Sequence, residues 1–472
     1  MTNPADLTAT DLVAAYRSGE LSPTEACEAV LARIDDLNPA LNAFLLVDGD
    51  RARKLAEEST ARWRRGEPCG LVDGVPVSIK DVLYTEGWPT LRGSRAIDPD
   101  QPWRENSPAV ARLLEHGAVP VGKTTTPELA WKAVTDSPLT GITRNPWDRE
   151  RTPGGSSGGA AAAVATGMAP LALGTDGGGS VRIPAAFTST VTLKPTYGLV
   201  PHFPASAFGT LAHTGPITNT VADAALMLDV ITEPDHRDWS ALPSPTSPFR
   251  GVGRHDLTGV RVAYSPTLGF ADAARILDPE VAAAVEAAAR AFEELGAHVE
   301  QVDPPIADPV DEFHVLWFTG AAASVAALPE HRRDGIDPGL VEIAAQGSTM
   351  SAVDWLRANN KRMELGLAMG RFHLDHDLLL TPTVPIPPFT AGKEVPDGWT
   401  RARWTSWTPF TYPFNMTQQP AASVPCGFTE GGLPIGLQVV GPRHADSLVM
   451  AACHVYEQLR LTRSDQRPKF SG

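Results

Sequence analysis

The sequence predicts an α/β protein whose sheet is covered by helices on both faces. From about residue 70, short apolar segments of strand length alternate with helical segments, a pattern typical of such sheets. The alternation resumes after each loop, including the Pro/Ser-rich stretch 242–248, which favours one large domain within the 472 residues. Apolar residues make up 42% of the chain and charged residues 20%, as in proteins that bury a large core.

The first sixty residues are predicted to be helical. Ser22 and Glu25 form a capping-box pattern around Pro23, which suits the first helical position. Apolar residues then recur at helical spacing until Asn38-Pro39, which is expected to end the helix. We therefore divide the chain into an N-terminal helical wrap, a main domain and a C-terminal tail: 1–60, 61–462 and 463–472.

The main domain is predicted to alternate strands and helices in chain order. Its early strands and helices are predicted at 75–79, 109–116, 118–121, 157–167, 171–175 and 180–187. A βαβ-like unit follows at 260–264, 279–295 and 298–302, and a hairpin near the end joins 421–426 to 435–440. Residues 383–414 are rich in Pro, Trp and Phe and show no clear period.

The charge and cysteine content exclude several classes of partner and compartment. Forty basic and 55 acidic residues give a net charge of −15, which argues against binding to nucleic acid or an anionic membrane. The four cysteines show no CxxC spacing, which suits a reducing compartment. No signal peptide or membrane-spanning run is visible, so we expect a soluble, cytoplasmic protein.

No cofactor or metal is predicted. His373 and His376 are the only close histidine pair, and they lack the H-E-x-x-H pattern of zinc sites. The glycine-rich segments fit neither the P-loop nor the G-x-G-x-x-G pattern, so a nucleotide site is not expected.

Ser180 is the best candidate for a nucleophile. It follows a predicted strand and three glycines and precedes a predicted helix. Glycine lets the backbone approach a reacting group closely, so the N–H groups of Gly177, Gly178, Gly179 and Ser180 could stabilise an oxyanion. The alternative is a tight turn in which Ser180 only caps the helix.

Ser156 lies in a second glycine-rich segment, Gly154-Gly155-Ser156-Ser157-Gly158, which also fits the G-x-S-x-G nucleophile elbow of α/β-hydrolases. An α/β-hydrolase would place an acid and then a histidine later in the chain, and His444 and His454 are available. That alternative leaves Lys80 and the second glycine–serine segment without a role.

Lys80 ends the apolar strand Val75–Ile79. A lysine at such a boundary usually extends its ammonium group into solvent. A buried lysine with a lowered pKa could instead serve as a base for a serine nucleophile.

Together, these three residues resemble the triad of the amidase signature family of serine hydrolases. Ser156 follows Lys80 by 76 positions and Ser180 follows Ser156 by 24, as the family pattern requires. Further segments that match the family's signature are 122–128, 182–186 and 415–441.

The resemblance implies the amidase signature fold, with a central mixed sheet, for the main domain. It implies that Ser180 forms the acyl-enzyme, that Ser156 bridges Ser180 and a neutral Lys80, and that the Gly155–Ser156 peptide is cis. It also implies that Ser157, Asp176 and Arg182 support the loop, although the last two could equally form an ordinary ion pair.

The substrate class is expected to be a small amide, with esters or carbamates as further candidates. The resemblance places Ala130, Trp131 and Gly155 at the substrate. Six aromatic residues in the irregular segment form either a lid over an apolar pocket, which would favour a hydrophobic or aryl substrate, or part of the core: Trp399, Trp404, Trp407, Phe410, Tyr412 and Phe414.

A partner-dependent function stays open as the alternative. Similar chains are glutaminase-like subunits of tRNA-dependent amidotransferases, which usually carry Asp-Thr-Gly-Gly-Ser at the nucleophile. This chain has Asp176-Gly177-Gly178-Gly179-Ser180, which is commoner in stand-alone amidases. A homodimer is compatible with the sequence.

Overall fold

The structure is a computed structural model that describes residues 3–251 and 256–463. Its centre is an 11-stranded mixed sheet in the order β1-β3-β2-β6-β8-β7-β12-β13-β11-β9-β10. The strands of this sheet are β1 Phe44–Val47, β2 Pro76–Lys80, β3 Val119–Thr124, β6 Leu171–Asp176, β7 Val191–Lys194, β8 His213–Thr218, β9 Arg261–Tyr264, β10 His298–Gln301, β11 Leu378–Pro382, β12 Ala421–Phe428 and β13 Pro434–Val440. Two short strands, β4 Asp136–Ser137 and β5 Gly141–Ile142, form a separate ladder.

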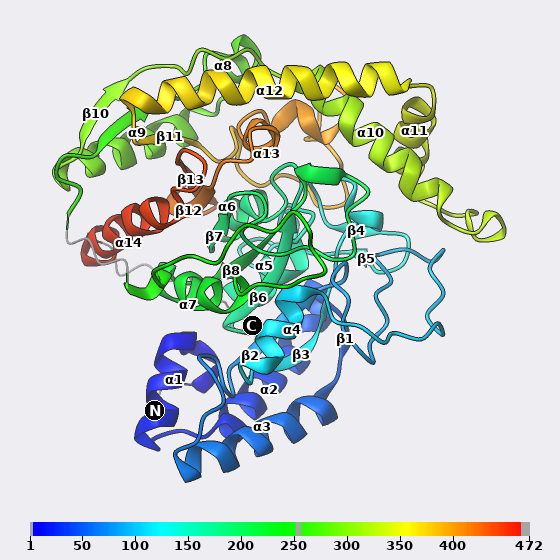
Figure 1. Ribbon diagram of the computed structural model, residues 1–472, viewed down its shortest axis with the longest axis vertical. Coiled ribbons are helices and arrows are strands. Elements are labelled where there is room, and N and C mark those ends of the chain that lie inside the picture. The colour runs from blue at the N-terminus through cyan, green and yellow to red at the C-terminus, as the bar shows by residue number, and fades with distance from the viewer. Residues whose placement is uncertain (1–2, 252–255, 464–472) are drawn as a thin grey trace.

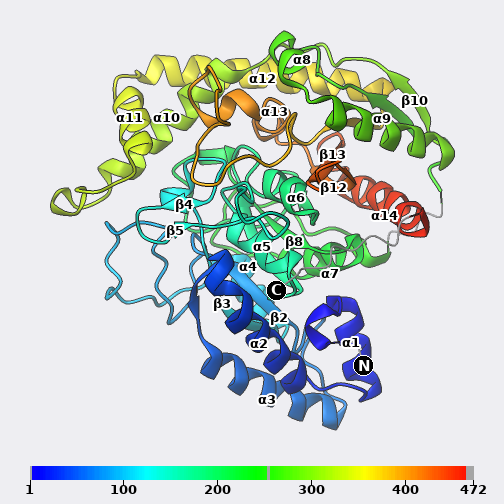
Figure 2. The same cartoon turned by 180° about the vertical axis from the view of Figure 1, so that it is seen from behind.

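Fourteen α-helices surround the sheet within the described residues (Figure 1). They are α1 Ala9–Ser18, α2 Pro23–Leu41, α3 Gly49–Arg65, α4 Pro108–Glu115, α5 Gly158–Ala165, α6 Arg182–Thr188, α7 Val221–Ile231, α8 Ala271–Ile276, α9 Pro279–Glu294, α10 Val310–Ala326, α11 Pro338–Ser348, α12 Ala352–Asp375, α13 Tyr412–Met416 and α14 Asp446–Arg463. Figures 1 and 2 show α1–α3 at one end of the molecule and α10–α12 at the other. None of the described helices is both long and apolar enough to cross a membrane.

Alternation of side chains explains why both faces of the sheet are covered. In β6, Leu171 and Leu173 join a large apolar cluster with residues of α4, α7, α9 and α14. Ala172, between them, points to the other face and packs with Ala160 and Val164 of α5. Because successive strand residues face opposite sides, an apolar run such as that of β6 is buried on both faces. The predicted fold class is confirmed, and its mixed character comes from parallel pairs such as β2–β6 beside antiparallel pairs such as β6–β8.

The predicted elements of the main domain lie close to the observed ones. In the βαβ-like unit, β9 and β10 are parallel with α9 between them. In the late hairpin, Ala421 pairs with Val440 and Phe428 with Pro434. The turn at Gly432 has a φ of 77°, a left-handed conformation that glycine adopts readily.

The N-terminal segment differs from its prediction at two points. First, it contains β1, which pairs with β3 at the edge of the sheet. Second, α2 continues through Pro39 to Leu41 and ends at Asn42, which has a left-handed conformation with a φ of 52°. The Asn38 side chain accepts hydrogen bonds from the N–H groups of Ala43 and Phe44 just beyond this end. The division at residue 60 falls inside α3 and stays a prediction, and most of the predicted C-terminal tail lies outside the described residues.

Candidate active site

Lys80 is the last residue of β2 and is fully buried. Val77 and Ile79 of the same strand face the large apolar cluster, so alternation turns Ser78 and Lys80 to the face that carries α5. The Lys80 Nζ lies 2.6 Å from Ser156 Oγ and 2.8 Å from Ser157 Oγ. Strand alternation therefore brings the lysine to both serines of the first glycine-rich segment.

The environment of Lys80 disfavours its charged form. Its Nζ contacts three hydroxyl groups, the third being Thr175 Oγ1 at 3.0 Å. No carboxylate lies within ion-pair distance of Lys80 in the described part of the chain. Desolvation lowers the pKa of Lys80 well below its usual value, and the negative charge of Asp176 opposes this only in part. A lysine in this state can accept a proton.

Ser156 and Ser157 lie in the turn before α5. The Gly155–Ser156 peptide bond is cis, as the resemblance implies. A Cβ on Gly155 would lie 2.6 Å from the backbone of Val134, so the chain can pass here only with glycine. The Ser157 hydroxyl donates a hydrogen bond to Thr175 O at 3.1 Å, and the Ser157 N–H donates one to Ser180 O at 3.1 Å. These two bonds tie the turn to the second glycine-rich segment.

Ser180 lies between β6 and α6, as predicted. The N-cap of α6 is Val181, and no side chain caps this helix. The Ser180 hydroxyl has no hydrogen-bond partner among the described residues, and it lines a cavity together with Ser156. The capping alternative is therefore wrong for Ser180.

The three glycines before Ser180 are required by close aromatic packing at the first two and by the backbone conformation at the third. A Cβ on Gly177 would lie 2.8 Å from the ring of Trp317, and one on Gly178 would lie 2.7 Å from the ring of Trp404. Gly179 has a φ of 126°, which L side chains rarely adopt. Close packing of this loop thus needs all three.

The N–H groups of this loop fall into two sets. Gly179 donates to Asp176 Oδ1 at 2.8 Å, so it is not available to an oxyanion, and its place in the predicted set of donors is wrong. The N–H groups of Gly177, Gly178 and Ser180 donate to no other group in the described structure and remain free.

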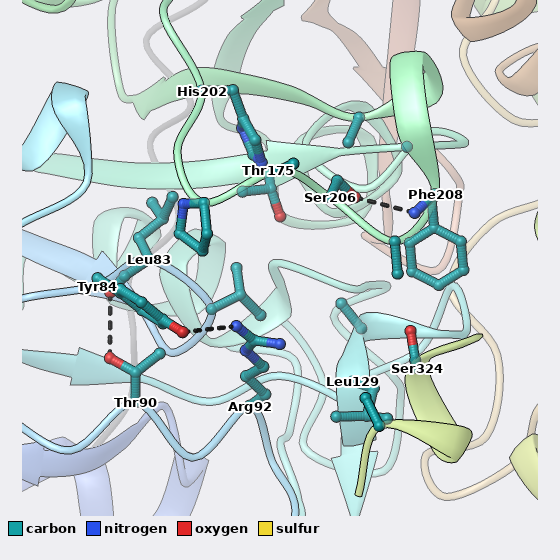
Figure 3. Close-up of a pocket in the computed structure, with 18 of the residues that line it drawn as sticks. Leu83, Tyr84, Thr90, Arg92, Leu129, Thr175, His202, Ser206, Phe208 and Ser324 are labelled. Carbon is teal, nitrogen blue, oxygen red and sulfur yellow. Dashed lines mark hydrogen bonds between the residues drawn. The ribbon is translucent and has the colours of Figure 1, made fainter. Parts of the chain in front are cut away.

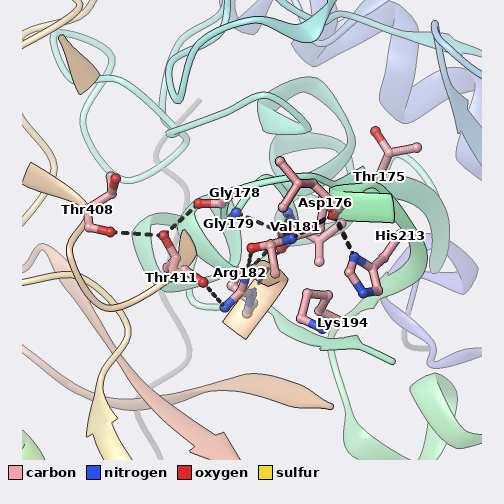
Figure 4. A network of polar contacts seen from close by, with 12 residues as sticks. Thr175, Asp176, Gly178, Gly179, Val181, Arg182, Lys194, His213, Thr408 and Thr411 are labelled. Carbon is pink, nitrogen blue, oxygen red and sulfur yellow. Dashed lines mark hydrogen bonds and ion pairs between the residues drawn. The ribbon is translucent and has the colours of Figure 1, made fainter. Parts of the chain in front are cut away.

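Asp176 and Arg182 form a buried, two-point ion pair that fixes the loop (Figure 4). Arg182 Nη2 lies 2.9 Å from Asp176 Oδ1, and its Nε lies 3.0 Å from Oδ2. Burial by itself would raise the pKa of Asp176, but the charge and hydrogen bonds of Arg182, with a hydrogen bond from Asn415, hold that pKa below its usual value. Asp176 stays a carboxylate, and its oxygens hold the N–H groups of Gly179 and Val181.

The same network reaches late parts of the chain. Arg182 donates to Thr411 O at 2.9 Å and to Gln438 Oε1 at 2.8 Å, and the Thr411 hydroxyl donates to Gly178 O at 2.7 Å. Asn415 donates to both Asp176 O and Oδ1. Sequence reasoning missed Thr411 and Thr175. Asn415 and Gln438 lie within the segment 415–441 that matches the family signature, and that match was their only signal.

A cavity of about 430 Å³ opens beside Ser156 and Ser180 (Figure 3). Phe208 stacks on Trp317 at 3.8 Å between ring centroids and forms an aromatic wall. Arg92 and Tyr84 lie together on another side, and Leu129 and Ala130 also line the cavity. The lining mixes apolar side chains with polar ones, among them Thr90, Gln101 and His202, as a site that both encloses and orients a small molecule requires.

Two of the three predicted substrate residues lie elsewhere. Trp131 is 1% exposed. Its ring packs against Gly339 of α11, so closely that a Cβ on that glycine would lie 2.6 Å from the ring. Gly155 packs against Val134, and only Ala130 lines the cavity. The cavity's aromatic wall comes instead from Phe208 and Trp317, which no local pattern marked.

The aromatic residues of 383–414 belong to the core. Trp407 is fully buried and stacks on Phe187 at 5.9 Å, and Trp404 packs edge-on to Trp317 at 5.5 Å. None of the six aromatic side chains lines the cavity in the described structure. The core alternative therefore describes this segment better than the lid.

The fold is that of the amidase signature enzymes. The chain matches the sequence model of the Amidase family over residues 25–450, and it belongs to this family. It is 38% identical to an acylamidase of Rhodococcus erythropolis over 98% of both chains. A solved bacterial aryl acylamidase of the amidase signature family superposes with a TM-score of 0.89 at 32% identity, over 96% of both chains. The chain is also 37% identical to a glutamyl-tRNA(Gln) amidotransferase subunit of Myxococcus xanthus, over 96% of this chain and 97% of that one.

Proposed function

We propose that this protein is a stand-alone amidase that hydrolyses a carboxamide bond through Lys80, Ser156 and Ser180. Membership of the amidase signature family makes it a hydrolase of C–N bonds. The observation that supports the particular mechanism is the contact of the buried Lys80, whose pKa desolvation lowers, with Ser156 Oγ at 2.6 Å; Ser156 and Ser180 line the same cavity.

The first half of the reaction forms an acyl-enzyme. Ser180 Oγ bonds to the carbonyl carbon, and its proton passes through the Ser156 hydroxyl to Lys80 Nζ. The carbonyl oxygen becomes an oxyanion, stabilised by free N–H groups of Gly177, Gly178 and Ser180. The C–N bond then breaks, and the proton returns from Lys80 through Ser156 to the leaving amine.

The second half releases the acid. Water attacks the acyl carbon, its proton follows the same path to Lys80, and the bond to Ser180 Oγ breaks as that oxygen regains the proton. Ser157 and the Asp176–Arg182 pair position these groups from outside the cavity, and Thr175 contacts Lys80 from the cavity wall.

The substrate class we propose is an amide with a hydrophobic or aryl portion. The wall of Phe208 and Trp317 suits an apolar group, and two relatives are named acylamidase and aryl acylamidase. Esters and carbamates would enter the same site.

Covalent labelling tests the assignment of the nucleophile. A fluorophosphonate should modify Ser180, located by mass spectrometry of the digested protein, and Ser180→Ala should lose the adduct. An adduct on Ser156 would favour the nucleophile elbow of an α/β-hydrolase. The only side-chain partner of Ser156 Oγ among the described residues is Lys80, which argues against a histidine base.

A glutaminase-like component of an amidotransferase is the second candidate, because of the 37% identity to such a protein. No Asp or Glu is among the described residues that line the cavity, so no carboxylate there would pair with the ammonium group of glutamine. Hydrolysis of acetanilide by the purified chain alone supports the amidase, whereas glutamine hydrolysis that needs added partner proteins and tRNA would support the alternative.

We also propose a cytoplasmic location. The support is that the four cysteines are free thiols in the structure.

A further inference from the structure

The cavity beside the two serines has one permanently charged side chain, that of Arg92. The described residues that line it include no Asp or Glu. His202 also lines it, but desolvation lowers the pKa of this histidine and so disfavours its charged form; the charge of Asp238 opposes this shift and that of Arg92 adds to it. The cavity therefore carries a net positive charge against an otherwise neutral wall.

Arg92 has no carboxylate partner among the described residues. Its side chain makes one hydrogen bond, from Nη2 to Tyr84 Oη at 3.3 Å, and its guanidinium lies 5.6 Å from the centre of the Tyr84 ring. A guanidinium has five N–H donors, so most of them are unused. Arg182, by contrast, is saturated by Asp176, Thr411, Asn415 and Gln438.

The backbone holds Arg92 firmly in this place. Its φ is 52°, in the left-handed region that residues with side chains seldom occupy. The Asp81 carboxylate accepts hydrogen bonds from the N–H groups on either side, of Leu91 at 3.1 Å and Gly93 at 3.3 Å. Arg92 O accepts from Leu129 N at 2.7 Å. Since Asp81 directly follows Lys80, the strand that presents the lysine also anchors the loop that presents the arginine.

We propose that Arg92 determines specificity by binding an anionic group of the substrate, so that the preferred substrates are aryl or otherwise apolar amides that bear a carboxylate. A carboxylate matches the planar fork of a guanidinium and can accept two of its unused N–H groups. Figure 3 shows Arg92 and Tyr84 across the pocket from Thr175 and His202, with Phe208 at its far side. This inference rests on the proposed amidase function.

The test compares pairs of anilides that differ only in a carboxylate. The pair with the group on the amine side is para-acetamidobenzoate and para-acetamidoacetophenone. The pair with the group on the acyl side is the anilide of succinic acid and that of levulinic acid. In each pair a methyl ketone replaces the carboxylate with little change of shape, and the two pairs reveal on which side of the scissile bond Arg92 acts.

The measured quantity is the ratio of kcat/KM for the carboxylated amide to that for its neutral partner. In the wild type this ratio should favour the carboxylate in at least one pair. Arg92→Met should lower that ratio roughly 10- to 100-fold, because a charged hydrogen-bonded pair is lost. Arg92→Lys should lower it less, since the charge remains without the planar fork.

Arg95→Met is the matched control. Arg95 is exposed, lies three residues from Arg92, does not line the cavity, and its replacement changes the net charge equally. The ratio of kcat/KM for the carboxylated amide to that for its neutral partner should be the same in Arg95→Met as in the wild type. A wild-type ratio that shows no preference for carboxylate in either pair, or that Arg92→Met leaves unchanged, would overturn the proposal.

Binding to an inactive variant separates this inference from the proposed function. Calorimetric titration of Ser180→Ala with the same four anilides measures affinity without turnover. If the wild type hydrolyses none of the four anilides, the proposed function is contradicted. The role of Arg92 is still supported if Ser180→Ala binds the carboxylated member of a pair more tightly and Ser180→Ala/Arg92→Met does not. Equal binding of both members in each pair contradicts it.

Discussion

Lys80 and Lys123 lie on neighbouring strands and are both fully buried, yet their surroundings differ. In the parallel pair of β2 and β3, Lys80 is opposite Thr124 and Lys123 is opposite Ile79. Lys80 Nζ contacts only hydroxyl groups, whereas Lys123 Nζ donates to Leu83 O at 2.6 Å and Thr90 Oγ1 at 2.9 Å and lies 3.9 Å from Asp81.

The two lysines differ in how readily each side chain can lose and regain a proton. Desolvation lowers the pKa of both lysines, but Asp81 opposes the effect at Lys123, whose pKa falls only to about 8. Lys123 supports the loop that also holds Arg92, while Lys80 faces a serine that lines the cavity. Burial alone does not make a lysine a base. The partners of the ammonium group decide it.

Replacing Lys80 should have the largest effect and should be kinetic. Lys80→Ala should lower kcat/KM for an anilide about 10³- to 10⁴-fold, because both the proton acceptor and the later donor are lost. Esters should suffer less, since an alkoxide needs a proton less than an amine does. Steady-state assays of both substrates measure this, with circular dichroism to verify folding. Near-wild-type anilide turnover would contradict the triad.

Replacing Lys123 should instead destabilise the fold. Lys123→Met leaves the buried Asp81 without its cation, which should lower the free energy of unfolding by about 3 kcal/mol. Denaturant unfolding of Lys123→Met and Lys80→Met measures the contrast. Lys80→Met should be near neutral, because it removes a buried amine with no carboxylate partner. Equal losses in both variants would show that the two lysines are alike.

Stability should depend on pH through these lysines. Their pKa values are lower in the folded state than in the unfolded chain, so between the two values the unfolded chain binds more protons. The free energy of unfolding therefore rises with pH in that window, for Lys123 from about pH 8 to about 10.4, by up to about 1.4 kcal/mol per pH unit for each lysine. In Lys123→Met, the free energy of unfolding should rise less steeply with pH between about 8 and 10.4 than in the wild type, as denaturant unfolding at several pH values measures. An unchanged slope would contradict the lowered pKa of Lys123.

Activity should rise with pH as Lys80 loses its proton. The smallest effect expected is a shift of this rise when a hydroxyl partner of Lys80 is removed. Thr175→Val deletes the 3.0 Å contact and should change kcat/KM by up to about tenfold and move the rise. Thr90→Val removes a contact of Lys123 and should leave the position of the rise where it is. A rise that moves equally in both variants would contradict a separate role for Lys80.

Much of the fold could be predicted from the chain because its signals are local. The apolar runs of β2 and β6 and the hairpin of β12 and β13 were predicted within a few residues. β1 was missed because four residues between two helices carry too little pattern, and its pairing with β3 is a long-range event. The glycine–serine segments and Lys80 were recognised by spacing, while Thr175, Phe208 and Trp317 lie in ordinary contexts.

By itself, the sequence determined the α/β class and the presence of two glycine-rich serine segments, because these depend on residue type and spacing, while the resemblance to the amidase signature family linked Lys80 to both serines. Only the tertiary structure decided that Gly179 gives its N–H to Asp176, that Trp131 and Trp407 are core, and that Arg92 enters the cavity without a partner. The physical reason is that hydrogen-bond partners, burial and local charge come from segments far apart in the chain, and no local pattern encodes which of them meet.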